Sequence, residues 1–498
     1  MSWETFAVAP SERKERKEKL STALLQMCED FGVTAFRDTL GRVLVRFPRG
    51  GHWELVPVGS DAFRRWITAV YFEQEEAAPS AGALDELELL LGAKTDAAPP
   101  RESFVRIGWT DDDRVFLDMG TQGWNSIEVS AAGWTLQEDH ALPFLRPTTQ
   151  REMTVPERGG SLELLRPFVN SDDGGFRRVV GWLISCWMPK GPYPVLALRG
   201  EQGSAKSTLS EMLKRIIDPT TPALRAMPQD EASVLVSAQN QHVSVFDNVS
   251  ALSHDMSDTL CRMATGGGLV RRKLYTDGEE AVLDVCRPVI LNGIGGSWLD
   301  RPDLLSRSIV VQLEPIEEQD RKPAAEIEAR FRTVLPKIQG ALLDAVSDAL
   351  RHSHDAPSDS LERMADAHKF VLAAELGGRL PWRCGEYTQA LTQGRRVAEL
   401  DALEDDGVAV RLRDLAAESW SGTPSNLLLK INGNASLAEQ RYLPQSSKAL
   451  SSHIERLTPM LRRHGVAVEK EKTRAGRLYR LWLLASDENF RPGGTVAI

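Results

Sequence analysis

The sequence has little of what marks a secreted or membrane-bound protein. It contains five cysteines, which are far apart and have no paired spacing, and this argues against a disulfide framework and against a zinc site. The N-terminus lacks an apolar signal core, and the most apolar run, residues 179–188, is too short to cross a membrane. We therefore expect a cytoplasmic protein that has no membrane partner.

A surplus of positive charge is also missing. The 60 Lys and Arg residues are outnumbered by 70 Asp and Glu residues, and the net charge is −10. Any contact with nucleic acid must therefore come from local basic patches. The length of 498 residues and the hydrophobic share of 42% are typical of a globular protein with roughly two to four domains.

A glycine-rich segment follows an apolar run in the middle of the chain. Residues 200–208 read Gly-Glu-Gln-Gly-Ser-Ala-Lys-Ser-Thr and come directly after the run 193–198. In a phosphate-binding loop of this pattern, Lys206 reaches the phosphate oxygens, the Ser207 hydroxyl can ligate Mg²⁺, and the following helix points its positive end at the anion. We predict ATP and Mg²⁺ as cofactors. The predicted nucleotide contacts are Gly200, Gln202, Gly203, Ser204, Ala205, Lys206, Ser207 and Thr208.

One position in this loop departs from the usual pattern. Ala205 stands where glycine is common. A methyl group is tolerated there if the residue has right-handed helical dihedral angles.

Apolar strands alternate with helices between residues 160 and 320, which is typical of a parallel sheet covered on both faces. Ligands of such sheets bind at the carboxyl ends of the strands. Asp247 ends the strand 243–246 and is a candidate ligand for the Mg²⁺ that bridges the phosphates. Asn292 ends the strand 289–291 and can hydrogen-bond the γ-phosphate or the attacking water, although an ordinary Asn-Gly turn is the alternative.

The residue after Asp247 is Asn248, where many ATPases have a glutamate that polarises water. An amide can orient water but cannot take its proton, so the identity of the base stays open between Asp247, Asp255 and Asp258. Arg307 comes just before the strand 309–313 and is the preferred candidate, ahead of Arg301, for an arginine finger that reaches a neighbouring subunit's phosphate. A surface salt bridge is the alternative for Arg307.

Two local basic patches are candidates for DNA contacts. In the first, Asp277-Gly278 predicts a hairpin turn, and the hairpin carries Arg271, Arg272, Lys273 and Tyr275. In the second, residues 446–480 contain nine Lys and Arg against three Glu, in a helix followed by a strand–turn–strand. Its candidate DNA contacts are Lys448, Arg456, Lys472, Arg474 and Arg477. A solvated hairpin and a module used only for packing are the respective alternatives.

Together these motifs resemble the superfamily 3 helicase ATPases of the AAA+ class. More closely, they resemble ATP-binding proteins of phages and integrated elements that are related to the C-terminal halves of primase-helicases. The resemblance rests on residues 200–208, 246–248, 264–276 and 287–294. It implies a ring, most often a hexamer, in which the basic hairpin contacts DNA in the pore. Residues 1–150 contain no primase-type catalytic cluster, so priming activity is not implied.

The predicted fold class is α/β, built around an AAA+ P-loop NTPase core at 160–320 with helices on both faces of a parallel sheet. The core is flanked by a small α+β segment (1–75), a small β-rich module (76–150), a helical region (321–420) and a C-terminal winged helix (421–490). Asp111, Asp112, Asp113 and Asp118 are expected to form a solvated turn and a strand rather than a metal site.

The predicted function is that of an ATP hydrolase, acting as a DNA helicase or translocase of a phage or mobile element. Single-stranded DNA would occupy the pore of a homo-oligomer, and duplex DNA would contact the winged helix. Two alternatives stay open. One is an ATPase switch in regulation or defence, which weak hydrolysis beside Asn248 would suit, and the other is a DNA-binding loader for another helicase.

Overall fold

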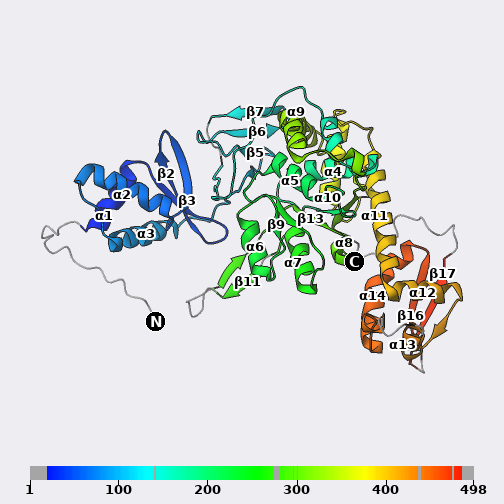
Figure 1. Ribbon diagram of the computed structural model, residues 1–498. Helices are drawn as coiled ribbons and strands as arrows, with labels where there is room; N and C mark the ends of the chain where they lie inside the picture. Colours follow the sequence, from blue (N-terminus) through cyan, green and yellow to red (C-terminus); the bar gives the residue numbers. More distant parts are fainter. Residues whose placement is uncertain are drawn as a thin grey trace, which may run out of the picture.

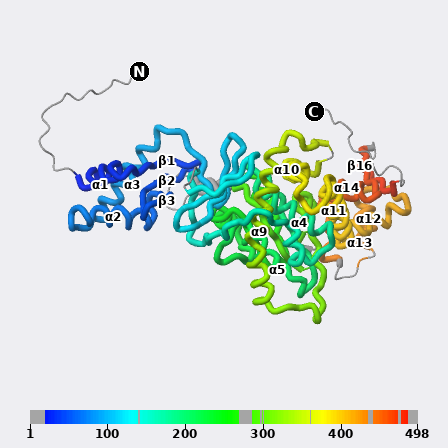
Figure 2. The backbone as a smooth tube through the Cα atoms, turned by 90° about the horizontal axis from the view of Figure 1, so that it is seen from above, coloured from blue at the N-terminus to red at the C-terminus, as the bar shows by residue number. Residues whose placement is uncertain are grey.

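The computed structural model describes residues 19–138, 142–267, 269–272, 280–283, 285–294, 297–299, 301–359, 361–433, 435, 439–473 and 476–484. These residues form an N-terminal unit, a central body and a C-terminal unit. The two outer units lie on opposite sides of the body in both views (Figure 1 and Figure 2). None of the helices within these described ranges is long and apolar enough to span a membrane.

The N-terminal unit is a three-stranded antiparallel sheet with helices packed on one face. Ser60 and Ser80 cap the second and third helices by accepting a backbone N–H bond. The third helix buries Leu87 and Leu91 with the first helix, so this compact unit extends to Thr95 rather than ending at residue 75. Its elements are α1 (Leu20–Asp30), β1 (Thr34–Arg37), β2 (Val43–Arg49), β3 (His52–Pro57), α2 (Asp61–Glu75) and α3 (Ala81–Thr95).

A four-stranded antiparallel sheet links this unit to the body. Its buried Asp118 accepts hydrogen bonds from Arg146 and Gln150, and Asp111–Asp113 form the preceding turn, so these acidic residues are a turn and a strand as expected. The Trp134 indole donates to the Asp344 carboxylate of the body over 3.0 Å. The strands are β4 (Ile107–Trp109), β5 (Val115–Asp118), β6 (Ser126–Ser130) and β7 (Gly133–Gln137).

The body is built on a parallel five-stranded sheet with the order β14-β8-β13-β10-β9. Its strands agree closely with the apolar runs of the sequence, because residues of strands buried on both faces are nearly all hydrophobic. They are β8 (Val195–Arg199), β9 (Arg225–Ala226), β10 (Ser244–Asp247), β13 (Val289–Gly293) and β14 (Ser308–Gln312).

Helices cover both faces of this sheet, as expected. Leu196 and Leu198 point into one hydrophobic cluster with α4, α5, α9 and α10, while Val195 and Ala197 point into a second cluster with α6, α7, α8 and α11. The helices are α4 (Asp173–Ser185), α5 (Lys206–Ile217), α6 (Glu231–Gln239), α7 (His254–Thr265), α8 (Pro302–Leu305), α9 (Ala324–Arg351), α10 (Ala365–Leu376) and α11 (Glu386–Asp405). Short 3₁₀ helices are η1 (Leu162–Phe168), η2 (Ser297–Leu299), η3 (Glu318–Asp320) and η4 (Glu439–Arg441).

The C-terminal unit is a helix, a short strand, two helices and a strand pair, in that order along the chain. Its first helix packs on the strand pair, so the unit begins at Gly407 rather than at residue 421. The elements are α12 (Gly407–Ala417), β15 (Ser421–Gly422), α13 (Pro424–Gly433), α14 (Ser447–Arg463), β16 (Val466–Thr473) and β17 (Gly476–Leu483). The strands form one antiparallel sheet in the order β15-β17-β16.

Candidate functional site

The carboxyl ends of β8, β13 and β10 bring the predicted site residues to one edge of the sheet. β13 lies between the other two strands, with Val289 paired to Val195 on one side and to Ser244 on the other. The loop 200–205 leaves β8, Asp247 ends β10, and Asn292 lies near the end of β13. Asn292 is therefore placed between the glycine-rich loop and Asp247.

The glycines of the loop are required by its geometry. A Cβ atom at Gly200 would lie 2.6 Å from the Ser204 hydroxyl oxygen and 2.8 Å from the Leu313 carbonyl oxygen, which is closer than packing allows. Gly203 has a φ of 84°, a conformation that side chains disfavour. The residues at the tip of the loop, Glu201 to Gly203, are exposed.

Ala205 does not meet the condition under which its methyl group would be free of strain. Ala205 has φ 62° and ψ 26°, which is left-handed rather than right-handed helical geometry. The methyl group crowds the following carbonyl in this conformation, at a cost of roughly 1–2 kcal/mol. Ala205 occupies the N-cap position of α5 and makes no side-chain cap, so this strain is stored at the start of the site helix.

The Lys206 side chain lies under the loop. Its Nζ donates to the Gly200 carbonyl over 2.9 Å, to the Glu201 carbonyl over 2.7 Å and to the Ser204 hydroxyl over 3.3 Å. Burial lowers the pKa of Lys206, and the charge of Asp247 opposes this shift. All three partners are neutral, so an anion in the loop would be the stronger partner for this ammonium group.

Ser207 and Asp247 are directly joined. The Ser207 hydroxyl donates to Oδ1 of Asp247 over 2.7 Å, which links the first turn of α5 to the end of β10. A hydroxyl and a carboxylate oxygen are hard ligands of the kind that Mg²⁺ takes, together with phosphate oxygens and water. Throughout the described part of the chain, no group of three or more His, Cys, Asp and Glu side chains could hold a metal ion by itself. Ser207 and Asp247 would supply two ligands for such a metal, and phosphate oxygens and water would supply the others.

Asn292 is fully buried, and both atoms of its amide are used within the protein. Its Oδ1 accepts the backbone N–H of Asn248 over 3.0 Å, and its Nδ2 donates to the Ser210 hydroxyl over 2.8 Å. Asn292 thus fastens the turn after β10 to α5. Its predicted contact with phosphate or water stays a prediction.

The Asn248 side chain is exposed, and its backbone has a φ of 57°, which asparagine tolerates better than most residues. Among the other candidate bases, Asp255 is exposed on α7, and Asp258 pairs with Arg301 over 2.9 Å. These observations single out no base besides Asp247.

Arg307 lies at the amino ends of the strands, whereas the loop lies at their carboxyl ends. Arg307 precedes β14, and the first residues of β14 and β8 are paired. The loop follows the last residue of β8. Its guanidinium donates to the Asp303 carbonyl over 2.9 Å. Arg307 therefore cannot reach the loop of its own subunit, and any finger role would have to be played on a neighbour.

Sequence reasoning missed Arg321, which approaches the loop from the segment after β14. Its Nη2 atom lies 3.7 Å from the position of a Cβ on Gly203. Arg321 belongs to no motif, and its position depends on how the chain runs between η3 and α9. Its proximity could therefore be found only in the structure.

Comparisons with known proteins bear on the body and the C-terminal unit together. The profile of actinomycete integrative conjugative element replication proteins, RepA, matches residues 163–406, and the profile of the RepA C-terminal domain matches residues 408–492. The chain belongs to this replication-protein family. It is thus a replication protein of a mobile element, as the resemblance suggested in coarser form.

Similar solved structures come from the NrS-1 C-terminal region. One A-form apo structure of this region is 13% identical, covers 93% of this chain and 99% of its own, and has a TM-score of 0.37. A second apo structure, of residues 305–718, is 12% identical, covers 94% of this chain and 100% of its own, and has a TM-score of 0.36. No curated protein matches the chain.

The first basic patch of this replication protein lies on a strand pair. β11 (Leu269–Arg272) and β12 (Glu280–Leu283) pair antiparallel, which confirms the two strands of the predicted hairpin. Arg271 and Arg272 are in β11, opposite Ala281 and Glu280. The predicted contacts Lys273 and Tyr275 lie outside the described residues.

The second basic patch lies within the RepA C-terminal domain. Lys448 and Arg456 are exposed on α14, and Lys472 pairs across the strands with Arg477, both also exposed. Like charges directly opposite one another destabilise a strand pair. The pairing of Lys472 with Arg477 therefore favours a role in binding an anion. Arg474 lies outside the described residues.

Proposed function

We propose that this replication protein is an ATP-dependent DNA helicase or translocase that works as a ring oligomer, with a hexamer as the preferred form. The observation that carries the proposal is the bond between Ser207 and Asp247 beside the buried Lys206. A lysine, a hydroxyl and a carboxylate at one sheet edge are the protein groups that nucleoside triphosphate hydrolysis needs.

The arrangement of the sheet supports the assignment of an AAA+ P-loop core. The strand that carries the loop, β8, lies next to the edge strand β14, and β13 separates it from β10, which ends in Asp247. This insertion gives the site a third polar position, Asn292, next to the reacting phosphate. Bound Mg·ATP would supply the phosphoanhydride bond that hydrolysis cleaves. Lys206 and the loop N–H groups would bind its phosphates, and Ser207 with Asp247 would hold the metal.

Arg307 supports the oligomer. The Arg307 guanidinium cannot reach the phosphate-binding loop of its own subunit, and it directly precedes the edge strand β14. This position suits a site that is completed by a neighbouring subunit. In such a site the guanidinium stabilises charge that develops in the transition state, at ~10³-fold or more in rate. Removal of Arg307 should then abolish hydrolysis while nucleotide binding remains.

The two basic patches support DNA as the partner. The order of elements in the C-terminal unit, a helix, a short strand, two helices and a strand pair, is that of a winged helix. Lys448 and Arg456 of α14 would meet a groove, and Lys472 with Arg477 would meet the phosphate backbone. Arg271 and Arg272 of β11 would contact a single strand in the pore.

One observation favours the alternative of an ATPase switch without strand separation. Asn248 exposes its side chain beside Asp247 and contributes no carboxylate to the site. Hydrolysis would then be slow, and a slow ATPase that changes state on binding suits recruitment of partners.

Displacement of a labelled strand from forked DNA, measured together with ATP hydrolysis, tests the proposal. The wild-type protein should hydrolyse ATP faster with single-stranded DNA and should displace the strand, and Lys206→Ala should do neither. Arg271→Ala combined with Arg272→Ala should abolish displacement and spare basal hydrolysis. Stimulated hydrolysis without displacement in the wild type would instead support the switch or a loader.

A further inference from the structure

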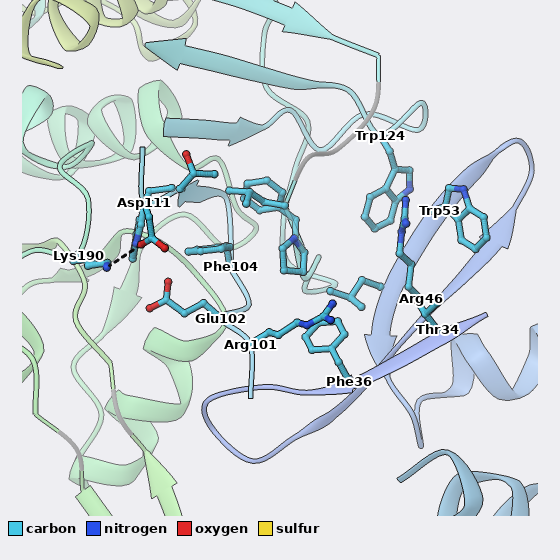
Figure 3. Close-up of a pocket in the computed structure, with 16 residues that line it drawn as sticks. Thr34, Phe36, Arg46, Trp53, Arg101, Glu102, Phe104, Asp111, Trp124 and Lys190 are labelled. Atoms are coloured by element: carbon cyan, nitrogen blue, oxygen red, sulfur yellow. Dashed lines mark ion pairs between the residues drawn. The ribbon is translucent and has the colours of Figure 1, made fainter. Parts of the chain in front are cut away.

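A cleft lies between the N-terminal unit and the β4–β7 sheet, and most of its lining precedes the residues that the family profiles match (Figure 3). Its volume is about 770 Å³, which falls in the range of ligand-binding pockets. Aromatic rings and basic groups line it from both sides. None of the functional assignments above uses it.

One wall of the cleft belongs to the face of the β1–β3 sheet that is turned away from the three helices. Along β2, Val45 and Phe47 point into the core under the three helices, whereas Arg46, between them in the sequence, faces the cleft. The register places Thr34 and Leu55 on either side of Arg46, and both also line the cleft. A small sheet thus has one face covered by helices and the other turned to the cleft.

Two arginines of this wall lie over aromatic rings. The Arg46 Cζ is 4.7 Å from the centroid of the Trp53 ring, and the Arg101 Cζ is 5.9 Å from that of Phe36. Figure 3 shows Arg46 beside Trp53 and Arg101 beside Phe36. Within the described ranges, no carboxylate forms an ion pair with Arg46 or Arg101, so both guanidinium groups can take a phosphate.

Aromatic side chains from the β4–β7 sheet and its loops also line the cleft. Trp124 is held between the Arg146 guanidinium, 3.7 Å from its centroid, and the His52 ring, stacked at 5.7 Å. Trp109 packs edge-on against Phe104 with centroids 5.0 Å apart. The Trp109 Nε1–H has no hydrogen-bond partner among the described residues. One donor at the wall of the cleft is therefore unused.

Charge in the cleft differs from that of the chain as a whole. Lys190 and Asp111 pair across 3.7 Å at one end, and Glu102 is exposed beside Arg101. The three cations outnumber the two carboxylates, in a protein whose net charge is −10. The carboxylates can accept hydrogen bonds from the amino groups of bases, while the cations attract phosphates.

We propose that this cleft binds single-stranded DNA. Its phosphates would draw Arg46 and Arg101 off the Trp53 and Phe36 rings, and bases would stack on the ring faces that the guanidinium groups leave. Stacking on aromatic side chains combined with a cationic track is how proteins hold single strands without reading their sequence. The faces of the bases are covered by neighbouring bases in a duplex, so only unpaired bases can stack on these rings. The site is separate from the two basic patches and does not depend on ATP hydrolysis.

Photocross-linking and fluorescence anisotropy on the full chain test this proposal. An oligonucleotide containing bromodeoxyuridine should cross-link to peptides within residues 34–55 or 101–124, and mass spectrometry would locate them. Trp53→Ala should weaken binding of a fluorescent oligothymidine about tenfold, which corresponds to the loss of one stacked base. Trp53→Phe keeps a ring and should retain most of the affinity.

The matched control for charge is Arg49→Ala, on the same strand outside the cleft. Arg46→Ala with Arg101→Ala should reduce the slope of log affinity against log salt by about 1.4, and Arg49→Ala should leave it unchanged. Near-ultraviolet circular dichroism checks that the variants are folded. Cross-links confined to residues beyond 163, or equal affinities for wild type and Trp53→Ala, would overturn the proposal. Competition by mononucleotides as effective as that by the oligonucleotide would assign the cleft to free nucleotide and overturn it too.

Discussion

Replacing Ala205 by glycine should stabilise the protein, although the same change in an ordinary helix destabilises it. Ala205 has a φ of 62°, where an L-residue costs roughly 1–2 kcal/mol more than in the right-handed region. Glycine removes this cost but gives back about 0.5–1 kcal/mol, because its unfolded chain is more flexible. The expected net gain in unfolding free energy is therefore about 0.5–1 kcal/mol.

The control for this prediction is Ala329→Gly. Ala329 is exposed within α9, so the substitution should cost about 1 kcal/mol of helix propensity without disturbing packing. Thermal unfolding of the nucleotide-free protein, followed by circular dichroism, should give a midpoint that rises for Ala205→Gly and falls for Ala329→Gly. Shifts of a few degrees are expected for a body of this size. If both variants lower the midpoint alike, the left-handed conformation of Ala205 is not a source of strain.

Two further predictions concern buried ionisable groups. Burial lowers the pKa of His242 to about 3 and that of His368 to about 4, so each histidine takes up a proton below pH ~6.5 only when the chain unfolds. The unfolding free energy should therefore decrease as the pH falls below this value, by about 1.4 kcal/mol per pH unit for each histidine. Urea titrations at several pH values should show a smaller decrease for His368→Gln than for the wild type. A pH dependence that is the same in both proteins would contradict this. Glu399 of α11 accepts hydrogen bonds from Arg463 over 2.6 and 3.0 Å and from His464 over 3.2 Å. Burial by itself raises the pKa of Glu399, but these hydrogen bonds outweigh the effect of burial, and the pKa is lowered. Glu399→Gln should loosen the C-terminal unit by about 1–2 kcal/mol and speed hydrogen exchange at the end of α14, whereas equal exchange rates would show that apolar packing alone holds the unit.

The strands and the shared edge of the site could be predicted from the sequence. β8, β10, β13 and β14 are short apolar runs separated by helices, and few other folds bury such runs on both faces. In a parallel sheet the polar residues that follow these runs must meet at one edge. Lys206, Asp247 and Asn292 are therefore placed correctly without knowledge of the strand order.

Other features depend on contacts that no local pattern encodes. The spacing of Leu87 and Leu91 predicts a helix but not the partner it packs on, which in the structure is the first helix. The conformation of Ala205 results from closing a short loop between two fixed elements. The position of Arg321 depends on the path of a connecting segment, and the cleft at Arg46 and Trp53 depends on how two small sheets face each other.

The second hydrophobic cluster of the body has a mechanical consequence. It runs without interruption from Leu291 in the sheet through Leu260 of α7 and Leu304 of α8 to Ile454 and Leu457 of α14. The C-terminal unit is thus packed against the side of the body through a continuous hydrophobic cluster, and is not merely connected to it by a linker. A rotation of α7 and α8 that follows a change at the phosphate-binding loop must therefore move α14 as well. Nucleotide binding would then displace the exposed lysines and arginines of the C-terminal unit.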